Sequence, residues 1–118
     1  MNAIITRPGE GERFVRENRV VTIRLDLPQL SVHEIEFDET FEVPKHRHPH
    51  VDALYVLAGT VEYASDDAVL RAGAGTLVAA PPGAAHGFRN AGPGAARVLV
   101  LHAPDGGFAD IVRNTRPR

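Results

Sequence analysis

The chain has 118 residues, a length that suits one domain with its own hydrophobic core. Thirteen basic and fifteen acidic residues give a net charge of -2, so the basic excess typical of nucleic-acid-binding domains is missing and we expect no nucleic-acid partner. No apolar run approaches the roughly 20 residues that cross a bilayer. The absence of cysteine excludes disulfides, thiolate catalysis and cysteine-bound zinc. We therefore expect a cytoplasmic protein without a membrane partner.

Short apolar or alternating runs, separated by turn residues, follow one another along the chain. They predict strands over residues 20–26, 30–37, 52–57, 60–64, 69–71, 76–80 and 97–102, a further strand that begins at His86, and one or two helical turns over 108–113. Glycine at position 59 allows a tight turn between two of these strands. Many short strands at this spacing are typical of an all-β sandwich or barrel.

The same pattern predicts the domain organisation. Residues 1–19 are interpreted as an N-terminal arm or edge strand, residues 20–113 as one barrel domain, and residues 114–118 as a C-terminal tail. The strands around Tyr55 and Leu99 are apolar on both faces, as in strands that are covered on both sides. In a chain this short, a second copy would supply that cover, and we expect a homodimer.

Histidines supply the densest chemistry of the sequence. His46 and His48 are two residues apart, so on an extended strand both point to the same face, and Asp52 follows in the same phase. Far along the chain, His86 follows a Pro-Pro-Gly turn and begins a strand. Imidazole and carboxylate groups of this kind bind divalent transition metals. Either segment alone is more often a set of solvated histidines.

Together the two segments resemble the two motifs of the cupin superfamily, in particular its small single-domain bacterial members. The first motif reads His46-x-His48, three residues, Asp52, six residues, Gly59. The second reads Gly75, five residues, Pro81-x-Gly83, two residues, His86, three residues, Asn90, without departure from the family pattern. The first motif departs twice, because Thr40 stands where the family has glycine and Asp52 where it has glutamate. The resemblance implies a double-stranded β-helix, or jelly-roll, barrel.

The resemblance also implies one divalent transition metal (Fe, Mn, Ni, Cu or Zn), with His46, His48, Asp52 and His86 as ligands. Aspartate is one methylene shorter than glutamate. Asp52 therefore coordinates directly, acts through a water, or leaves a three-histidine site. His50 is an alternative ligand, although Pro49 disturbs the alternation that would aim it. A cupin barrel without a functional metal site is the remaining alternative.

A substrate pocket is expected beside the metal. Its candidate residues are those that share the inward phase of the ligands or lie close to them: His33, His50, Leu54, Val56 and Phe88. For the three apolar residues, simple filling of the barrel is an equal alternative. His33 and His102 are interpreted as histidines of a sheet, hydrogen-bonded or solvated, rather than as catalytic bases.

The expected function is that of a metal-dependent, dioxygenase-like enzyme that acts on a small organic molecule. Residues 103–109 resemble the segment that closes small cupins likened to quercetin dioxygenase, but with Ala109 in place of an acidic residue. One alternative is a metal-dependent isomerase or lyase, for which His33, His50 and Tyr63 are proton-transfer candidates. The other is a module that binds a small ligand without turning it over. No catalytic residue is assigned from the sequence.

Overall fold

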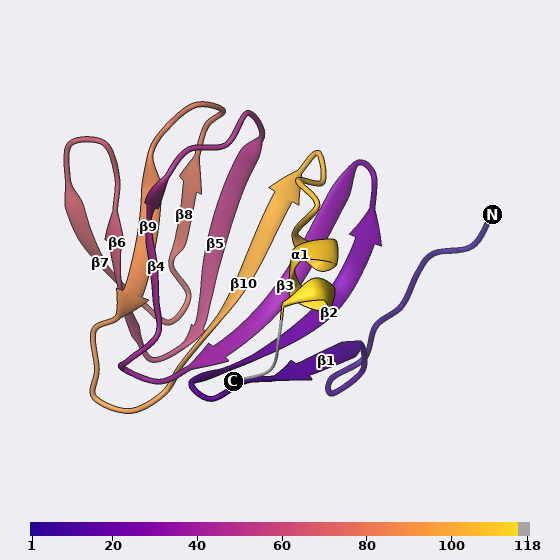
Figure 1. Ribbon diagram of the computed structural model, residues 1–118, viewed down its shortest axis with the longest axis horizontal. Coiled ribbons are helices and arrows are strands. Elements are labelled where there is room, and N and C mark those ends of the chain that lie inside the picture. Colours follow the sequence, from indigo (N-terminus) through magenta and orange to yellow (C-terminus); the bar gives the residue numbers. More distant parts are fainter. Residues whose placement is uncertain (116–118) are drawn as a thin grey trace.

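The computed structural model describes residues 1–115, which form two antiparallel β-sheets and one short helix (Figure 1). One sheet has six strands in the order β1-β2-β3-β10-β5-β8, and the other has four in the order β4-β9-β6-β7. The elements are β1 (Glu12–Val15), β2 (Arg19–Leu27), β3 (Leu30–Phe37), β4 (Glu42–His46), β5 (Val51–Ala58), β6 (Thr60–Ala64), β7 (Val69–Gly73), β8 (Leu77–Ala80), β9 (His86–Asn90), β10 (Ala96–Ala103) and α1 (Phe108–Asn114). The predicted all-β fold is confirmed.

All the strands that the sequence pattern predicts are present. β3 and β6 coincide with the predicted ranges, and β9 begins at His86 as expected. The other predicted strands differ by one or two residues at an end. Residues 116–118, most of the predicted C-terminal tail, lie outside the described residues.

Two strands were not predicted as separate elements, and both lie at sheet edges. β1 falls in the segment interpreted as an arm or edge strand and pairs only with β2 in the described structure. β4 is an edge strand of the four-stranded sheet and contains Pro44, which an edge tolerates. Because β4 ends at His46, His48 lies in the following loop. An extended strand thus carries His46 but not His48, although the two side chains converge as expected.

The core fills the space between the two sheets. Val56, Val61 and Val98 are completely buried there, together with Tyr63. The β5–β6 turn is held against this core by Gly59, which has a φ of 80°. A Cβ at this position would lie 2.8 Å from the Ala95 carbonyl oxygen, so only glycine fits.

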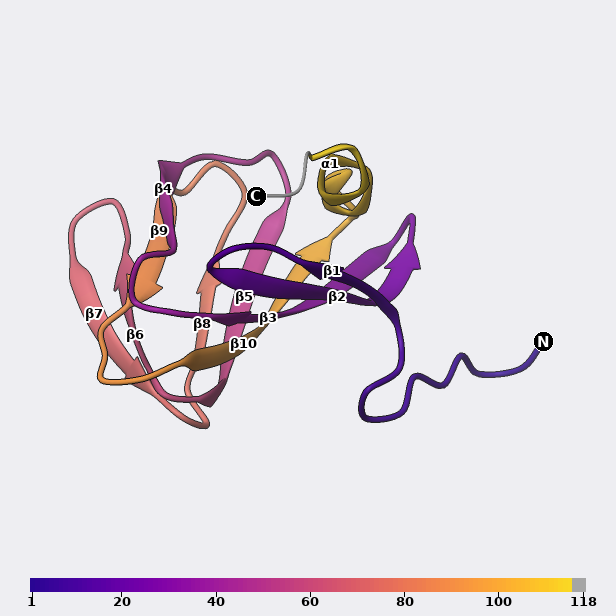
Figure 2. The same ribbon diagram turned by 60° about the horizontal axis from the view of Figure 1, so that its bottom comes forward.

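The helix covers part of the barrel next to β2 and β3 (Figures 1 and 2). Phe108, its first residue, lies with its ring 4.3 Å from that of His33 on β3. Arg113 near its end pairs with Glu12 of β1 at 2.7 Å and Asp26 of β2 at 3.3 Å. Within residues 1–115, no helix has the length and apolar character needed to span a membrane.

Candidate metal centre

Three histidines and one aspartate from both sheets meet at one end of the barrel. His46 ends β4 and His86 begins β9, and the two are register partners in the four-stranded sheet. Asp52 comes from β5 of the facing sheet, and His48 comes from the loop between β4 and β5. One ligand atom from each of these residues lies within 4.8 Å of the others. The structure thus brings together all four residues named as candidate ligands.

The backbone determines which ring nitrogen two of these histidines present. His46 Nδ1 lies 2.8 Å from the Pro44 carbonyl oxygen, and His86 Nδ1 lies 3.0 Å from that of Ala84. Because a carbonyl oxygen can only accept, each Nδ1 carries a hydrogen and donates it. In the neutral ring each Nε2 then presents a bare lone pair, which is the form that binds a metal.

These lone pairs converge on one point. His46 Nε2 is 2.8 Å from His48 Nε2, and His86 Nε2 is 2.9 Å from Asp52 Oδ2. The second contact is not a hydrogen bond, and the buried His86 Nε2 has no hydrogen-bond partner among the described residues. Adjacent ligands of one metal ion are separated by about 3.0–3.4 Å, given metal–nitrogen bonds of about 2.1 Å. The two separations are within about 0.2 Å of this range, and the lone pairs of His46 and His86 belong to one cluster, so the arrangement is compatible with a divalent cation.

The electrostatics keep the ligands in the forms that bind metal. Burial by itself would raise the pKa of Asp52, but the hydrogen bond from His102 and the neighbouring histidines bring this pKa below its ordinary value. Burial, together with the nearby His46 and His50, lowers the pKa of His48 to about 4. At neutral pH the site thus holds a carboxylate and a neutral imidazole.

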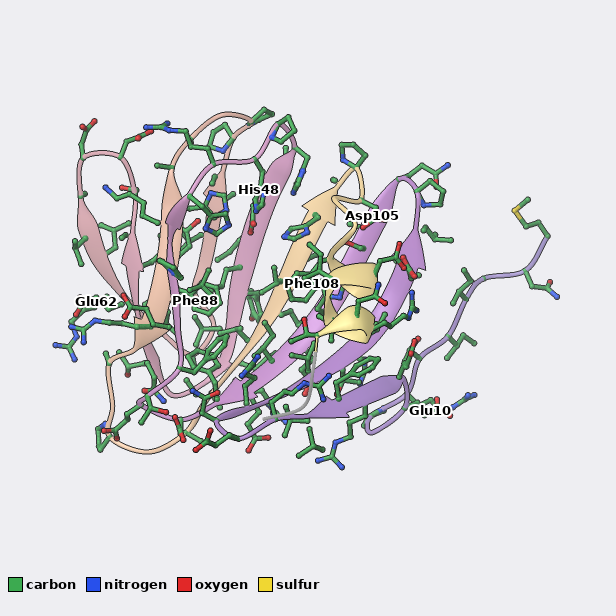
Figure 3. All side chains as sticks on the ribbon, in the orientation of Figure 1. Glu10, His48, Glu62, Phe88, Asp105 and Phe108 are labelled. Atoms are coloured by element: carbon green, nitrogen blue, oxygen red, sulfur yellow. The ribbon has the colours of Figure 1, made fainter. Side chains whose placement is uncertain are left out.

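A small apolar cavity of about 90 Å³ opens onto these ligands. Phe88 from β9 and Phe108 from α1 both line it, and Figure 3 shows where they lie relative to His48. The complete lining is Val21, Ile35, Phe41, Val43, His46, His48, Asp52, His86, Phe88, Val100, His102 and Phe108. The cavity therefore joins an apolar wall to the ligand cluster.

The other pocket candidates take different places. Leu54 and Val56 are 1% and 0% exposed in the core between the sheets, and neither lines this cavity. His33 is also fully buried, and neither of its ring nitrogens has a hydrogen-bond partner within the described part of the chain. The expectation that His33 is hydrogen-bonded or solvated is therefore wrong.

His102 is a hydrogen-bonded histidine of a sheet, as expected, but it also belongs to the cluster, which was not predicted. It stands opposite Asp52 in the β10–β5 register, and its Nε2 donates a hydrogen bond of 3.0 Å to Asp52 Oδ2. His50 is buried as well, and its ring stacks on His48 with centroids 4.5 Å apart. The signal that could have found His102 is its shared inward phase with Val98 and Val100 on the last strand.

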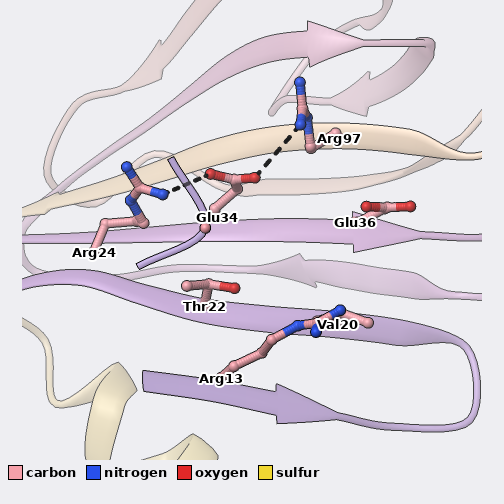
Figure 4. A pocket seen from close by; sticks show the side chains of 8 residues that line it. Arg13, Val20, Thr22, Arg24, Glu34, Glu36 and Arg97 are labelled. Atoms are coloured by element: carbon pink, nitrogen blue, oxygen red, sulfur yellow. Dashed lines mark ion pairs between the residues drawn. The ribbon is translucent and has the colours of Figure 1, made fainter. Parts of the chain in front are cut away.

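A larger hollow of about 330 Å³ lies on the outer face of the six-stranded sheet, away from the histidines (Figure 4). Glu34 lies between two arginines there, 3.6 Å from Arg24 and 3.9 Å from Arg97. These charges pair with one another, and the lining residues contain no histidine. The potential metal ligands therefore line the smaller cavity and not this hollow.

Comparisons with known proteins agree with this fold. KdgF from Halomonas sp. is 22% identical with a TM-score of 0.80, covering 90% of this chain and 99% of its own. An uncharacterized conserved protein with a double-stranded β-helix domain from Klebsiella pneumoniae is 29% identical with a TM-score of 0.66, and the match covers 86% of this chain and 84% of that protein. A predicted oxalate decarboxylase from Thermotoga maritima is 16% identical with a TM-score of 0.75, and the match covers 86% of this chain and 100% of that protein. A search of curated protein sequences gives no match. The model of the family described as "Cupin domain" matches residues 33–102, more than half of the sequence, and the chain therefore belongs to the cupin family.

Proposed function

We propose that this cupin is a metal-dependent, dioxygenase-like enzyme that acts on a small organic molecule. One divalent transition metal would be held by Nε2 of His46, His48 and His86 and by the carboxylate of Asp52. The observation that carries the proposal is the pair of backbone hydrogen bonds that turns the lone pairs of His46 and His86 toward the same point.

A bound ion of this kind supplies Lewis acidity and, when it is iron or copper, reactivity toward O₂. Four protein ligands leave one or two coordination positions for the substrate. The residues of the chain then bind and orient that substrate and exclude water from it. Phe88 and Phe108 perform this role because they line the cavity next to the ligands.

The cavity also limits the substrate class. Its volume of about 90 Å³ accommodates a small molecule or one end of a larger one. The wall away from the ligands is apolar, and no arginine or lysine lines it, so a phosphate group would find no cationic partner there. We infer a mostly apolar substrate with one polar group directed at Asp52 and the histidines.

Elemental analysis tests the metal part of the proposal. Wild-type protein, purified without chelator or metal-charged resin, should contain about one equivalent of a divalent transition metal. His48→Ala should lose this metal, whereas Lys45→Ala should keep it because Lys45 is exposed and outside the cluster. A wild-type protein that neither contains nor takes up iron, manganese, nickel, copper or zinc would overturn the metal centre.

Oxygen consumption tests the reaction class. Protein loaded with Fe(II) should consume O₂ in the presence of a small, mostly apolar substrate, and His48→Ala should not. Substrate turnover that continues under anaerobic conditions would replace the oxygenase proposal with an isomerase or lyase. Saturable binding without turnover in both atmospheres would identify a module that binds a small ligand.

A further inference from the structure

Two ligand sets of the same composition overlap in this barrel. The first is His46, His48, His86 and Asp52, and the second is His48, His50, His102 and Asp52. Each contains three imidazoles and one carboxylate. We propose that the second set is an alternative position for the metal ion, which shares His48 and Asp52 with the first. This inference rests on the metal centre of the proposed function, but it does not depend on catalytic turnover.

Asp52 lies at the centre of the two sets. Its Oδ2 is 2.9 Å from His86 Nε2, which belongs to the first set, and 3.0 Å from His102 Nε2, which belongs to the second. One carboxylate oxygen is thus almost equally far from a histidine of either set. His102 Nε2 carries the hydrogen that it donates to this oxygen, so the bare lone pair of the His102 ring is on Nδ1. In the second set, too, the ligand atoms all lie within 4.8 Å of one another.

The two histidines found only in the second set are buried and incompletely bonded. His50 is 7% exposed and His102 is 4% exposed. His50 Nε2 and His102 Nδ1 are buried atoms without a hydrogen-bond partner among residues 1–115. A buried polar atom without a partner is unfavourable, and metal coordination by these rings removes that cost.

Packing holds His50 in this place. Its ring stacks on His48 at 4.5 Å and lies 4.7 Å from the ring of His102. On another side the backbone of Gly106 passes so close that a Cβ there would lie 2.9 Å from His50 Nε2. His50 is therefore enclosed between His48, His102 and the residue-106 backbone.

One ion at a time occupies the two positions. Both sets depend on the carboxylate of Asp52 and on the ring of His48. Two divalent ions a few ångströms apart would share a single negative side chain, and their mutual repulsion in a buried site is large. The sets therefore compete for one ion.

The two positions differ in their access to the cavity. All four residues of the first set line it, whereas the second set contributes only His48, Asp52 and His102, because His50 lies outside the lining. Three of the four residues of the second set are buried, against two of the first. An ion in the second position would therefore be coordinated in part by a residue outside the cavity, and a site without an open coordination position is typical of an ion held for structure.

Zinc titration against a chromophoric chelator tests the proposal. The double variant His46→Ala/His86→Ala keeps only the second set intact and should bind one equivalent of Zn(II) within about tenfold of the wild-type affinity. Adding His102→Ala should weaken binding by at least about 100-fold, because only His48, His50 and Asp52 remain. Co(II) bound to the double variant should absorb visible light more strongly than Co(II) in the wild type, as expected for a closed tetrahedral site.

Two results would overturn the inference. The first is a double variant that is folded by circular dichroism and binds Zn(II) no better than the triple variant. The second is a wild-type protein that binds two equivalents tightly. The milder His46→Ala, at a half-buried position, repeats the comparison if the double variant does not fold. In that background His102→Ala should weaken binding at least about tenfold more than it does in wild type. Metal binding by wild type but not by these variants would leave the proposed function standing.

Discussion

Gly106 and His50 are in contact across the end of the barrel, and no side chain fits between them. A Cβ built on Gly106 overlaps the imidazole of His50. The φ of Gly106 is not in the left-handed region, so its backbone would accept an L residue. Glycine is required at this position because of the ring and not because of the turn.

We expect Gly106→Ala to displace His50 and to lower the free energy of unfolding by about 1–3 kcal/mol, the usual cost of overpacking a buried site. Gly73→Ala is the matched control, since a Cβ there meets nothing within 4 Å. It should change stability by no more than about 0.5 kcal/mol. Urea denaturation of the apo proteins measures both. Equal stability of the two variants would contradict the contact.

The buried His33 should make apo-protein stability depend on pH. Burial, with a contribution from His102, lowers the pKa of His33 to about 4 from the ordinary value of 6.5. Between these values the unfolded chain binds a proton that the folded chain does not, so stability falls as the pH decreases from 6.5 to 4. The contribution is about 1.4 kcal/mol per pH unit.

Urea denaturation with excess chelator at several pH values between 4.5 and 7 measures this dependence. His33→Phe replaces the ring with one that cannot titrate and should reduce the slope by about one proton. A residual slope is expected, because the pKa of His48 is also lowered to about 4. An unchanged slope in His33→Phe would show that His33 is not the buried titrating group.

Asn90, the last residue of the second motif, is expected to stabilise the fold and not to bind metal. Its Nδ2 donates to the carbonyl oxygens of Phe37 at 3.1 Å and Gly94 at 2.7 Å, and its Oδ1 accepts from the Gly92 N–H at 2.7 Å. Asn90→Ala should cost about 1–3 kcal/mol, because it leaves the Phe37 carbonyl without its buried partner and removes two part-buried hydrogen bonds. The exposed Asn114→Ala is the control and should cost about 0.5 kcal/mol or less. The metal content of Asn90→Ala should stay at the wild-type level, and a loss of metal would contradict the purely structural role of Asn90.

The homodimer remains a prediction, and the outer face of β5 and β8 is where we expect the second copy. Tyr55 and Leu77 are cross-strand partners there and are 37% and 62% exposed. Leu77→Arg should convert a dimer to a monomer, because it places a charge in an apolar contact. Val69→Arg, at a position 65% exposed in the other sheet, should leave the assembly unchanged. Light scattering coupled to size exclusion gives the mass, and a monomeric wild type would end this prediction.

The sequence pattern was sufficient for the strands that have one buried face and insufficient for the others. β3 shows buried and less buried residues in alternation, and its predicted limits are exact. β1 and β4 have no fully buried residue, so no hydrophobic alternation marks them. They become strands because their neighbours offer a backbone edge, which is a property of the tertiary structure.

The same distinction holds for the cluster. The motif spacing brought His46, His48, Asp52 and His86 into one hypothesis, and the structure places them together. The proximity of His102 to Asp52 follows only from the register of β10 against β5, which no local pattern contains. Pro49 argues against His50 as a ligand on the basis of strand alternation, but the position of His50 is defined by its stacking on His48 and by the backbone of Gly106.

The hydrogen bonds from His46 and His86 to main-chain carbonyls have an evolutionary consequence. Many metal-binding histidines are oriented by a carboxylate side chain, which a single mutation can remove. Here the acceptors are peptide groups two residues earlier in the chain, and every amino acid at positions 44 and 84 supplies one. The orientation of both ligands is thus inherited with the fold itself. The residues around the cavity are correspondingly free to diverge toward new substrates while the metal-binding tautomer stays the same.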